Sequence, residues 1–150
     1  MNFRGRYEHS LDAKHRLTIP AKYRDVLSKG VVLALAPETS PGAPRSIAIW
    51  ISEEYDAHVE GALSRLNPIS PEAAKLRRLL NNNAHDTELD SAFRVMIPAT
   101  QIEFAELGKE VVVTGSGNCL EVWDRARYDA YNSAALSEYP ELAASIGHSS

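Results

Sequence analysis

Residues 11–21, Leu-Asp-Ala-Lys-His-Arg-Leu-Thr-Ile-Pro-Ala, recur as residues 89–99, Leu-Asp-Ser-Ala-Phe-Arg-Val-Met-Ile-Pro-Ala, with six of eleven positions identical. The similarity extends beyond these two segments. Ile-Ala-Ile-Trp at 47–50 matches Leu-Glu-Val-Trp at 120–123, and Tyr-Asp-Ala follows both tryptophans, at 55–57 and 128–130. Self-similarity of this kind indicates an internal repeat, so one unit of about 50 residues occurs twice in the chain.

A unit of this size with only a few strands is too small to bury its apolar face alone. We therefore expect the two copies to complete one another in a single pseudo-symmetric barrel. The predicted fold class is α+β and mainly β, with short flanking helices. We expect repeat 1 at residues 3–60, a linker helix within 61–85, repeat 2 at 86–133 and a C-terminal tail at 134–150.

The local pattern of repeat 1 predicts alternating strands and short helices. From Phe3 to Leu11 the apolar and polar residues alternate, which is typical of a half-buried strand with its arginines on the outer face. Residues 12–15 form a turn and residues 16–19 a second strand. Pro20 then opens a short helix to Leu27, and Gly30 ends it.

Later segments carry equally local signals. The proline-rich residues 36–46 predict a long hairpin loop, whereas residues 115–118, Gly-Ser-Gly-Asn, predict a tight turn at the matching place in repeat 2. We expect Ser52 and Asp124 to cap the last helix of each repeat, and Ser70-Pro71 to start a linker helix over 73–80. About 14 residues would then follow the last helix.

Charge is unevenly distributed along the chain. The formal net charge is −4, but the first 30 residues hold seven basic and three acidic side chains, so their net charge is +4 and that of the rest is −8. This asymmetry favours a basic working surface on an acidic body. A single cysteine and the absence of an apolar run of bilayer length predict a cytoplasmic protein with no internal disulfide and no membrane partner.

Catalytic patterns are absent from the sequence. The five histidines show no metal-ligand spacing, and no His-Glu-x-x-His pattern occurs. Cys119 precedes an apolar strand and is expected to be a small core residue rather than a nucleophile. We therefore predict no enzyme activity, no metal, no cofactor and no small-molecule substrate.

The repeated Asp-x-x-x-Arg brackets a turn in both copies, as Asp12 with Arg16 and as Asp90 with Arg94. Each carboxylate can accept turn amides and fix the direction of the guanidinium. These pairs can have a purely structural role, in which they stabilise the turn. The first turn also contains Lys14 and His15, and the adjoining strand carries Arg4 and Arg6. A cationic patch of this kind can bind DNA phosphates, and an arginine at a loop tip can read guanine. The candidate DNA-binding residues are therefore Arg4, Arg6, Asp12, Lys14, His15, Arg16, Asp90 and Arg94.

Residues 3–24 resemble the N-terminal signature of the MraZ proteins, bacterial transcriptional regulators of the division and cell wall gene cluster. Residues 88–98, 108–115 and 120–123 resemble the second half of these proteins. The resemblance implies two AbrB-like swapped-hairpin repeats, a homo-oligomeric ring, and a nucleoid-associated repressor that binds short direct DNA repeats upstream of its own operon. It also implies DNA contacts through Asp12, Arg16, Asp90 and Arg94, with Lys14 on a phosphate.

The family usually has glycine before each motif arginine, where this chain has His15 and Phe93. If this position needs a positive φ, phenylalanine is strained there by about 1–3 kcal/mol. We therefore expect the second loop to adopt another shape, or Phe93 to pack against a neighbouring subunit, and Arg94 to contribute less than Arg16.

Two other functions fit the same residues. One is a DNA-binding antitoxin with a protein partner, which the short expected tail disfavours. The other is a structural ring module that binds no DNA, in which the arginine loops are clips.

Overall fold

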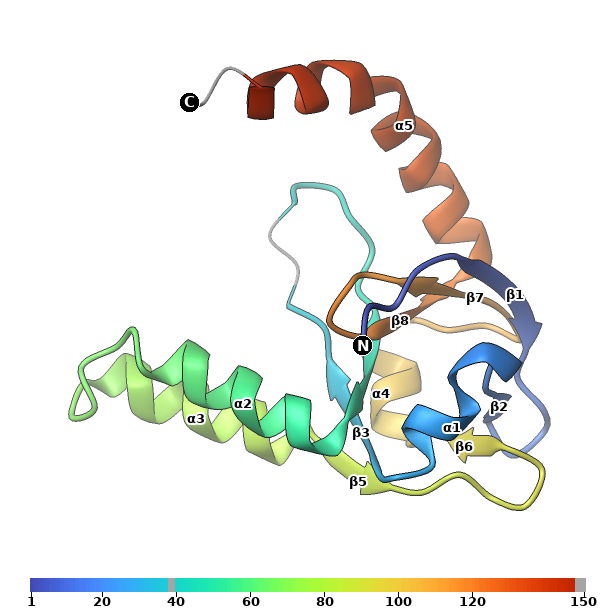
Figure 1. The fold of residues 1–150 in the computed structure, drawn as a ribbon, viewed down its shortest axis with the longest axis horizontal. Coiled ribbons are helices and arrows are strands. Elements are labelled where there is room, and N and C mark those ends of the chain that lie inside the picture. Colours follow the sequence, from blue (N-terminus) through green and yellow to red (C-terminus); the bar gives the residue numbers. More distant parts are fainter. Residues whose placement is uncertain (38–39, 148–150) are drawn as a thin grey trace.

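The computed structural model describes residues 1–37 and 40–147 and contains two antiparallel sheets joined by short helices (Figure 1). The larger sheet has the order β1-β7-β8-β4-β3-β5, and β2 pairs with β6 in a separate ladder. The strands are β1 (Arg6–Ser10), β2 (Arg16–Thr18), β3 (Val31–Leu35), β4 (Ile47–Ile51), β5 (His85–Thr87), β6 (Arg94–Met96), β7 (Glu110–Gly115) and β8 (Leu120–Asp124).

The two repeats exchange their first strands. β1 of the first repeat pairs with β7 of the second, and β5 of the second pairs with β3 of the first. The expected closed barrel is wrong, because β1 and β5 form the two edges of an open six-stranded sheet. β2 and β6 are only three residues long and pair with each other, so they cover the sheet without closing it.

The strand registers obey an internal two-fold symmetry. In the β2–β6 ladder, Leu17 faces its own repeat equivalent, Val95. In the β4–β8 pair, Ala48 likewise faces Glu121, the residue that matches it in the second repeat. A pseudo-two-fold axis therefore passes through both pairs, which confirms that the duplication in sequence is a duplication in structure.

Residues on both faces of the central strands are buried, which explains their nearly continuous apolar sequences. In β3, Val31 and Leu33 join the main core, whereas Val32 and Ala34 face a second cluster that contains Trp50. The main core also holds Leu17 and Val95 from the two-stranded ladder, together with Tyr23. The ladder is thereby fixed rigidly to the larger sheet.

The helices begin close to the predicted residues. They are η1 (Ala21–Tyr23, a 3₁₀ turn), α1 (Arg24–Leu27), α2 (Ser52–Leu63), α3 (Pro71–Asn82), α4 (Ala99–Phe104) and α5 (Arg125–Gly147). Ser70 caps α3 as expected, since its hydroxyl accepts a hydrogen bond from the Ala73 amide at 3.1 Å. Asp124 accepts one from the Arg127 amide at 3.3 Å, whereas Ser52 starts α2 without a side-chain cap.

The turn and loop expectations are largely confirmed. Gly115 ends β7, and the Ser116 amide donates to the Cys119 carbonyl across the predicted tight turn. The long loop lies between β3 and β4, and its residues 38–39 are outside the described part of the chain.

Two helical projections extend from this body (Figure 1). α2 and α3 pack against each other as one projection beyond β3 and β4. α5 forms the other and starts directly after β8. The expectation that about 14 residues follow the last helix is wrong, because α5 continues to Gly147 across the expected tail.

Candidate nucleic-acid interface

The first Asp-x-x-x-Arg loop is a compact hydrogen-bonded turn. One oxygen of the Asp12 carboxylate accepts hydrogen bonds from the backbone amides of Lys14 and Arg16, both at 2.9 Å. The other oxygen accepts from Nε of Arg16 at 2.6 Å. The carboxylate therefore shapes the turn and orients the arginine at the same time, as the sequence predicts.

The second loop has the same geometry. Asp90 accepts from the amides of Ala92 and Arg94 at 2.9 Å, and from Nε of Arg94 at 2.9 Å. The expectation that Phe93 forces another loop shape is wrong. The reason is that Asp90 supplies the same three hydrogen bonds as Asp12, so the loop keeps its conformation in spite of the bulkier residue.

The residue before each arginine does have a positive φ. The value is 57° at His15 and 61° at Phe93. The carbonyls of these residues accept hydrogen bonds from the amides of Ile97 and Ile19, respectively, both at 2.9 Å. The left-handed conformation thus directs each carbonyl to the partner loop, and the bond between repeats holds the strained residue in place.

The two loops lie side by side across the pseudo-two-fold axis. Nη1 of Arg94 is 3.8 Å from the Asp12 carboxylate of the other loop. In both arginine side chains about 30% of the surface remains exposed. Within the ladder Leu17 and Val95 are buried, so the alternating residues Arg16, Thr18, Arg94 and Met96 lie on its outer face. This face therefore presents two guanidiniums with fixed directions.

Hydrogen bonding lowers the pKa of both aspartates. The backbone amide of Arg16, followed by its side chain and the amide of Lys14, lowers the pKa of Asp12 from 3.8 to about 2. The backbone amide of Arg94 lowers the pKa of Asp90 in the same way. Both carboxylates are therefore charged at neutral pH and hold the arginines by charge-assisted hydrogen bonds.

Arg4 and Arg6 are not part of this group. Arg6 pairs with Asp129 of α5 at 2.7 Å and lies 5.9 Å from the Tyr128 ring centre. Arg4 has an exposed side chain, and its amide donates to the Tyr23 hydroxyl. Arg6 begins β1 and Arg4 precedes it, so both lie at the end of this strand that is farther from the loop at residues 12–15.

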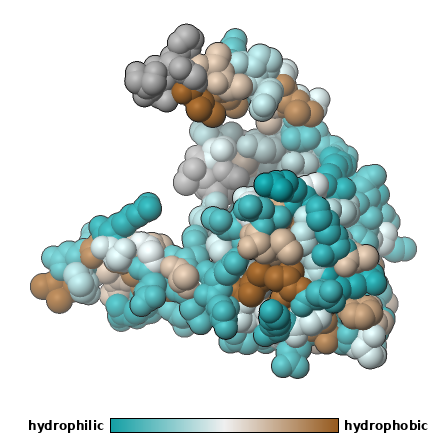
Figure 2. Space-filling model, in the orientation of Figure 1, coloured by the Kyte–Doolittle hydropathy of each residue, from teal (hydrophilic) through white to brown (hydrophobic). Residues whose placement is uncertain are grey.

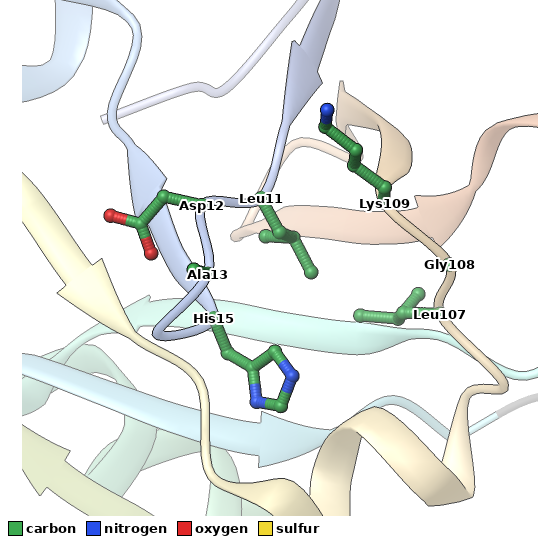
Figure 3. A pocket seen from close by; sticks show the side chains of 7 residues that line it. All are labelled: Leu11, Asp12, Ala13, His15, Leu107, Gly108 and Lys109. Atoms are coloured by element: carbon green, nitrogen blue, oxygen red, sulfur yellow. The ribbon is translucent and has the colours of Figure 1, made fainter.

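Two further cationic side chains, those of Arg24 and Lys109, lie beside the loops, and the sequence did not predict this placement. The Arg24 guanidinium stacks 4.8 Å from the ring centre of Phe93, which is 41% exposed. The second loop therefore has a neighbouring cation, which α1 of the first repeat supplies. Lys109, from the second repeat, lines a pocket of about 460 Å³ together with His15 and Asp12 of the first loop (Figure 3). No local sequence signal links Arg24 or Lys109 to the loops, because the contacts are between repeats.

Cys119 is buried, as predicted, and burial raises the pKa of its thiol to about 11. Within residues 1–37 and 40–147, no group of three metal-ligating side chains is close enough together to hold an ion.

Comparison with known proteins identifies the family. A family model described as "MraZ protein, putative antitoxin-like" matches residues 2–79 and again residues 80–144. This chain belongs to the MraZ family. Each matched MraZ segment contains one Asp-x-x-x-Arg loop, so the two halves of the family match are the two repeats of the fold.

Proteins named transcriptional regulator MraZ are similar to this chain over most of their length. The protein of Thiobacillus denitrificans is 38% identical over 135 residues, which cover 90% of this chain and 89% of the relative. The Mycoplasmoides gallisepticum protein is 35% identical over 96% of both chains. The Roseiflexus castenholzii protein is 40% identical over 88% of this chain and 87% of its own. In this MraZ chain, none of the helices among the described residues could span a membrane.

Proposed function

We propose that this MraZ-family chain is a DNA-binding transcriptional regulator that acts through its paired Asp-x-x-x-Arg loops. The observation that carries the proposal is the outer face of the β2–β6 ladder. Two arginines there are each fixed by an aspartate through Nε and remain about 30% exposed. Because Nε is occupied, the terminal nitrogens are the ones left to approach a phosphate or the edge of a guanine.

The shape of this surface also suits DNA. A two-stranded β-ribbon fits the major groove of B-form DNA, where arginine binds guanine and an apolar side chain contacts the thymine methyl group. The ribbon formed by β2 and β6 carries the exposed Met96 beside its arginines. Lys14, His15, Arg24 and Lys109 surround it as further phosphate or positioning contacts.

The relatives named transcriptional regulators support this assignment. We infer that the protein represses the division and cell wall gene cluster at the nucleoid by binding direct repeats in its own promoter. We also infer that it assembles as a homo-oligomeric ring with AbrB-like swapped-hairpin repeats. Once one subunit of a ring is bound, the next is held near the adjacent DNA repeat, which strengthens binding by about 10²- to 10⁴-fold.

A mobility-shift assay with the duplex upstream of the protein's own gene tests the proposal. Arg16→Ala should abolish retention of this duplex at a protein concentration that fully shifts it with the unsubstituted chain. Arg127→Ala is the matched control, because Arg127 is exposed but pairs with Glu106 away from the ladder. Wild-type retention by Arg16→Ala would refute DNA binding through these loops.

The antitoxin function is the second candidate, and α5 gives it a specific basis. Leu136, Tyr139 and Leu142 on this helix are more than half exposed, which is typical of a surface that binds protein. Purification of the chain from its native cells with a stoichiometric small protein would favour this function over an autonomous regulator.

A further inference from the structure

The repeats are symmetric in their strands but not in the helices that follow them. Trp50, Tyr55 and His58 match Trp123, Tyr128 and Tyr131 in the repeat alignment. Both sets form aromatic clusters, with ring centres 4.6 Å apart for Trp50 and His58 and 4.9 Å apart for Trp123 and Tyr128. α2 and α5 are therefore equivalent helices on equivalent sheet positions.

α2 has a helical partner, whereas the main contacts of α5 among the described residues are with strands. The Tyr55 hydroxyl of α2 donates to the Leu80 carbonyl of α3 at 2.6 Å, and the two helices pack against each other. The equivalent Tyr128 hydroxyl instead donates to the Asn132 side chain of its own helix, at 3.4 Å. Beyond this point α5 extends from the body, and its main contacts are with β7 and β8 near its start.

The extended part of α5 carries apolar side chains at helical spacing. Leu136 is 63% exposed, Tyr139 65% and Leu142 56%. Residues three or four apart lie on one side of a helix, so these three residues form a continuous stripe. Glu138, four residues before Leu142, borders the stripe, and no basic residue occurs between 128 and 147. The partner of this helix should therefore be apolar at its centre and basic along one edge.

The α2–α3 projection has a complementary surface. Leu79 is 53% exposed on α3, and Lys75 and Arg78 are exposed within one helical turn of it. Ile69, at the end of the projection, is 90% exposed. Figure 2 shows apolar patches at the end of this projection and along α5, on two separate projections of the molecule. One chain therefore carries two complementary surfaces, one on α5 and one on α3, and the two surfaces lie on different projections.

We propose that α5 of one chain docks on the outer face of α3 in a second copy. The stripe formed by Leu136, Tyr139 and Leu142 would cover Leu79, with Glu138 beside Lys75 and Arg78. Such a contact is heterologous, because two different surfaces meet, and heterologous contacts generate rings when the rotation closes. The inference rests on the assembly in the proposed function and names its surfaces.

Complementation between two full-length variants tests this docking by light scattering after size exclusion. Tyr139→Lys with Leu142→Lys disrupts the α5 surface and leaves α3 intact. Arg78→Glu with Leu79→Glu disrupts α3 and leaves α5 intact. Each variant alone should run as a monomer of about 16.5 kDa, whereas a mixture should form a complex of two chains and no larger species.

A matched control places two lysines on the opposite side of the same helix. Ser137→Lys with Ala144→Lys should assemble like the unsubstituted chain, which separates loss of docking from damage to α5. Circular dichroism should show equal helix content in all three variants.

The proposal is overturned if the α5 variant assembles by itself, if the mixture stays monomeric, or if α5 is saturated by a different protein while the chain alone is a monomer. DNA retention reports separately on the proposed function. Arg16→Ala should lose DNA binding and keep the mass of the assembled protein. DNA retention and assembled mass therefore test the two proposals separately.

Discussion

One aspartate in each loop sets the geometry of the candidate interface. Asp12 and Asp90 each bind two backbone amides and one arginine Nε, so one carboxylate sets both the loop shape and the direction of the cation. A residue that does both is sensitive to its protonation, because the neutral acid loses the charge that strengthens all three bonds.

Titration of Asp12 should show this dependence. Its pKa is lower in the folded protein than in the unfolded chain, so the carboxylate stabilises the fold above about pH 4 and this contribution is lost as the pH falls through about 2. Carboxyl NMR should give a midpoint near 2. In Arg16→Ala the midpoint should move only part of the way to 3.8, because the largest cause is the backbone amide, which remains. A midpoint at 3.8 in the unsubstituted chain would contradict the loop geometry.

The left-handed residue in the same loop provides a second prediction. A non-glycine residue with φ near 57° costs about 1–3 kcal/mol, whereas glycine costs about 0.5–1 kcal/mol more entropy on folding than alanine. His15→Gly should therefore stabilise the fold by up to about 1 kcal/mol, or about 2–4 °C in Tm. Ala13→Gly, in the same turn but without a positive φ, should not raise the Tm. A lower Tm for His15→Gly would show that the strain is absent.

The residues that precede β1 lie very close to the end of β7. Phe3, which precedes β1, forms a bridge with Gly117, and the Gly115 amide donates to the Gly5 carbonyl at 2.9 Å. A Cβ at Gly115 would lie 2.3 Å from the Arg4 nitrogen and 2.4 Å from the Phe3 carbonyl carbon. Both are backbone atoms, so the crossing cannot adjust by a rotamer change.

Gly115→Ala should therefore lower the free energy of unfolding by about 1–3 kcal/mol, which chemical denaturation can measure. Gly61 is the matched control, because a Cβ there meets nothing within 4 Å. Gly61→Ala should stabilise α2 by about 0.5–1 kcal/mol, since alanine is the better helix former. Equal effects of both substitutions would contradict the tight crossing.

The fold of the whole molecule depends on strand pairing between its two repeats. β1 has no strand partner in its own repeat among the described residues, and neither has β5. The ladder of β2 and β6 likewise takes one strand from each repeat. A separated half would therefore lack the partners of two of its strands.

Fragments 1–83 and 84–150 test this dependence. Neither should fold as a monomer, whereas an equimolar mixture should recover the β-sheet signal in circular dichroism and a mass of one chain. A half that folds alone should do so only as a dimer, in which a second copy replaces the other repeat. Cooperative unfolding of a monomeric half would show that the repeats are independent domains.

The sequence by itself determined the elements and their duplication. Apolar alternation, Ser70-Pro71 and Gly30 are local signals, and the repeat of residues 11–21 at 89–99 predicted the two Asp-x-x-x-Arg loops and the role of their aspartates. Local hydrogen bonds form these features, so a local pattern can show them.

Only the tertiary structure decided how the repeats combine. It left the sheet open, placed Arg6 on Asp129, brought Arg24 to Phe93, and extended α5 away from the body of the molecule. Each of these depends on contacts between residues far apart in sequence, and such contacts are set by packing of the whole chain rather than by the preferences of any one segment.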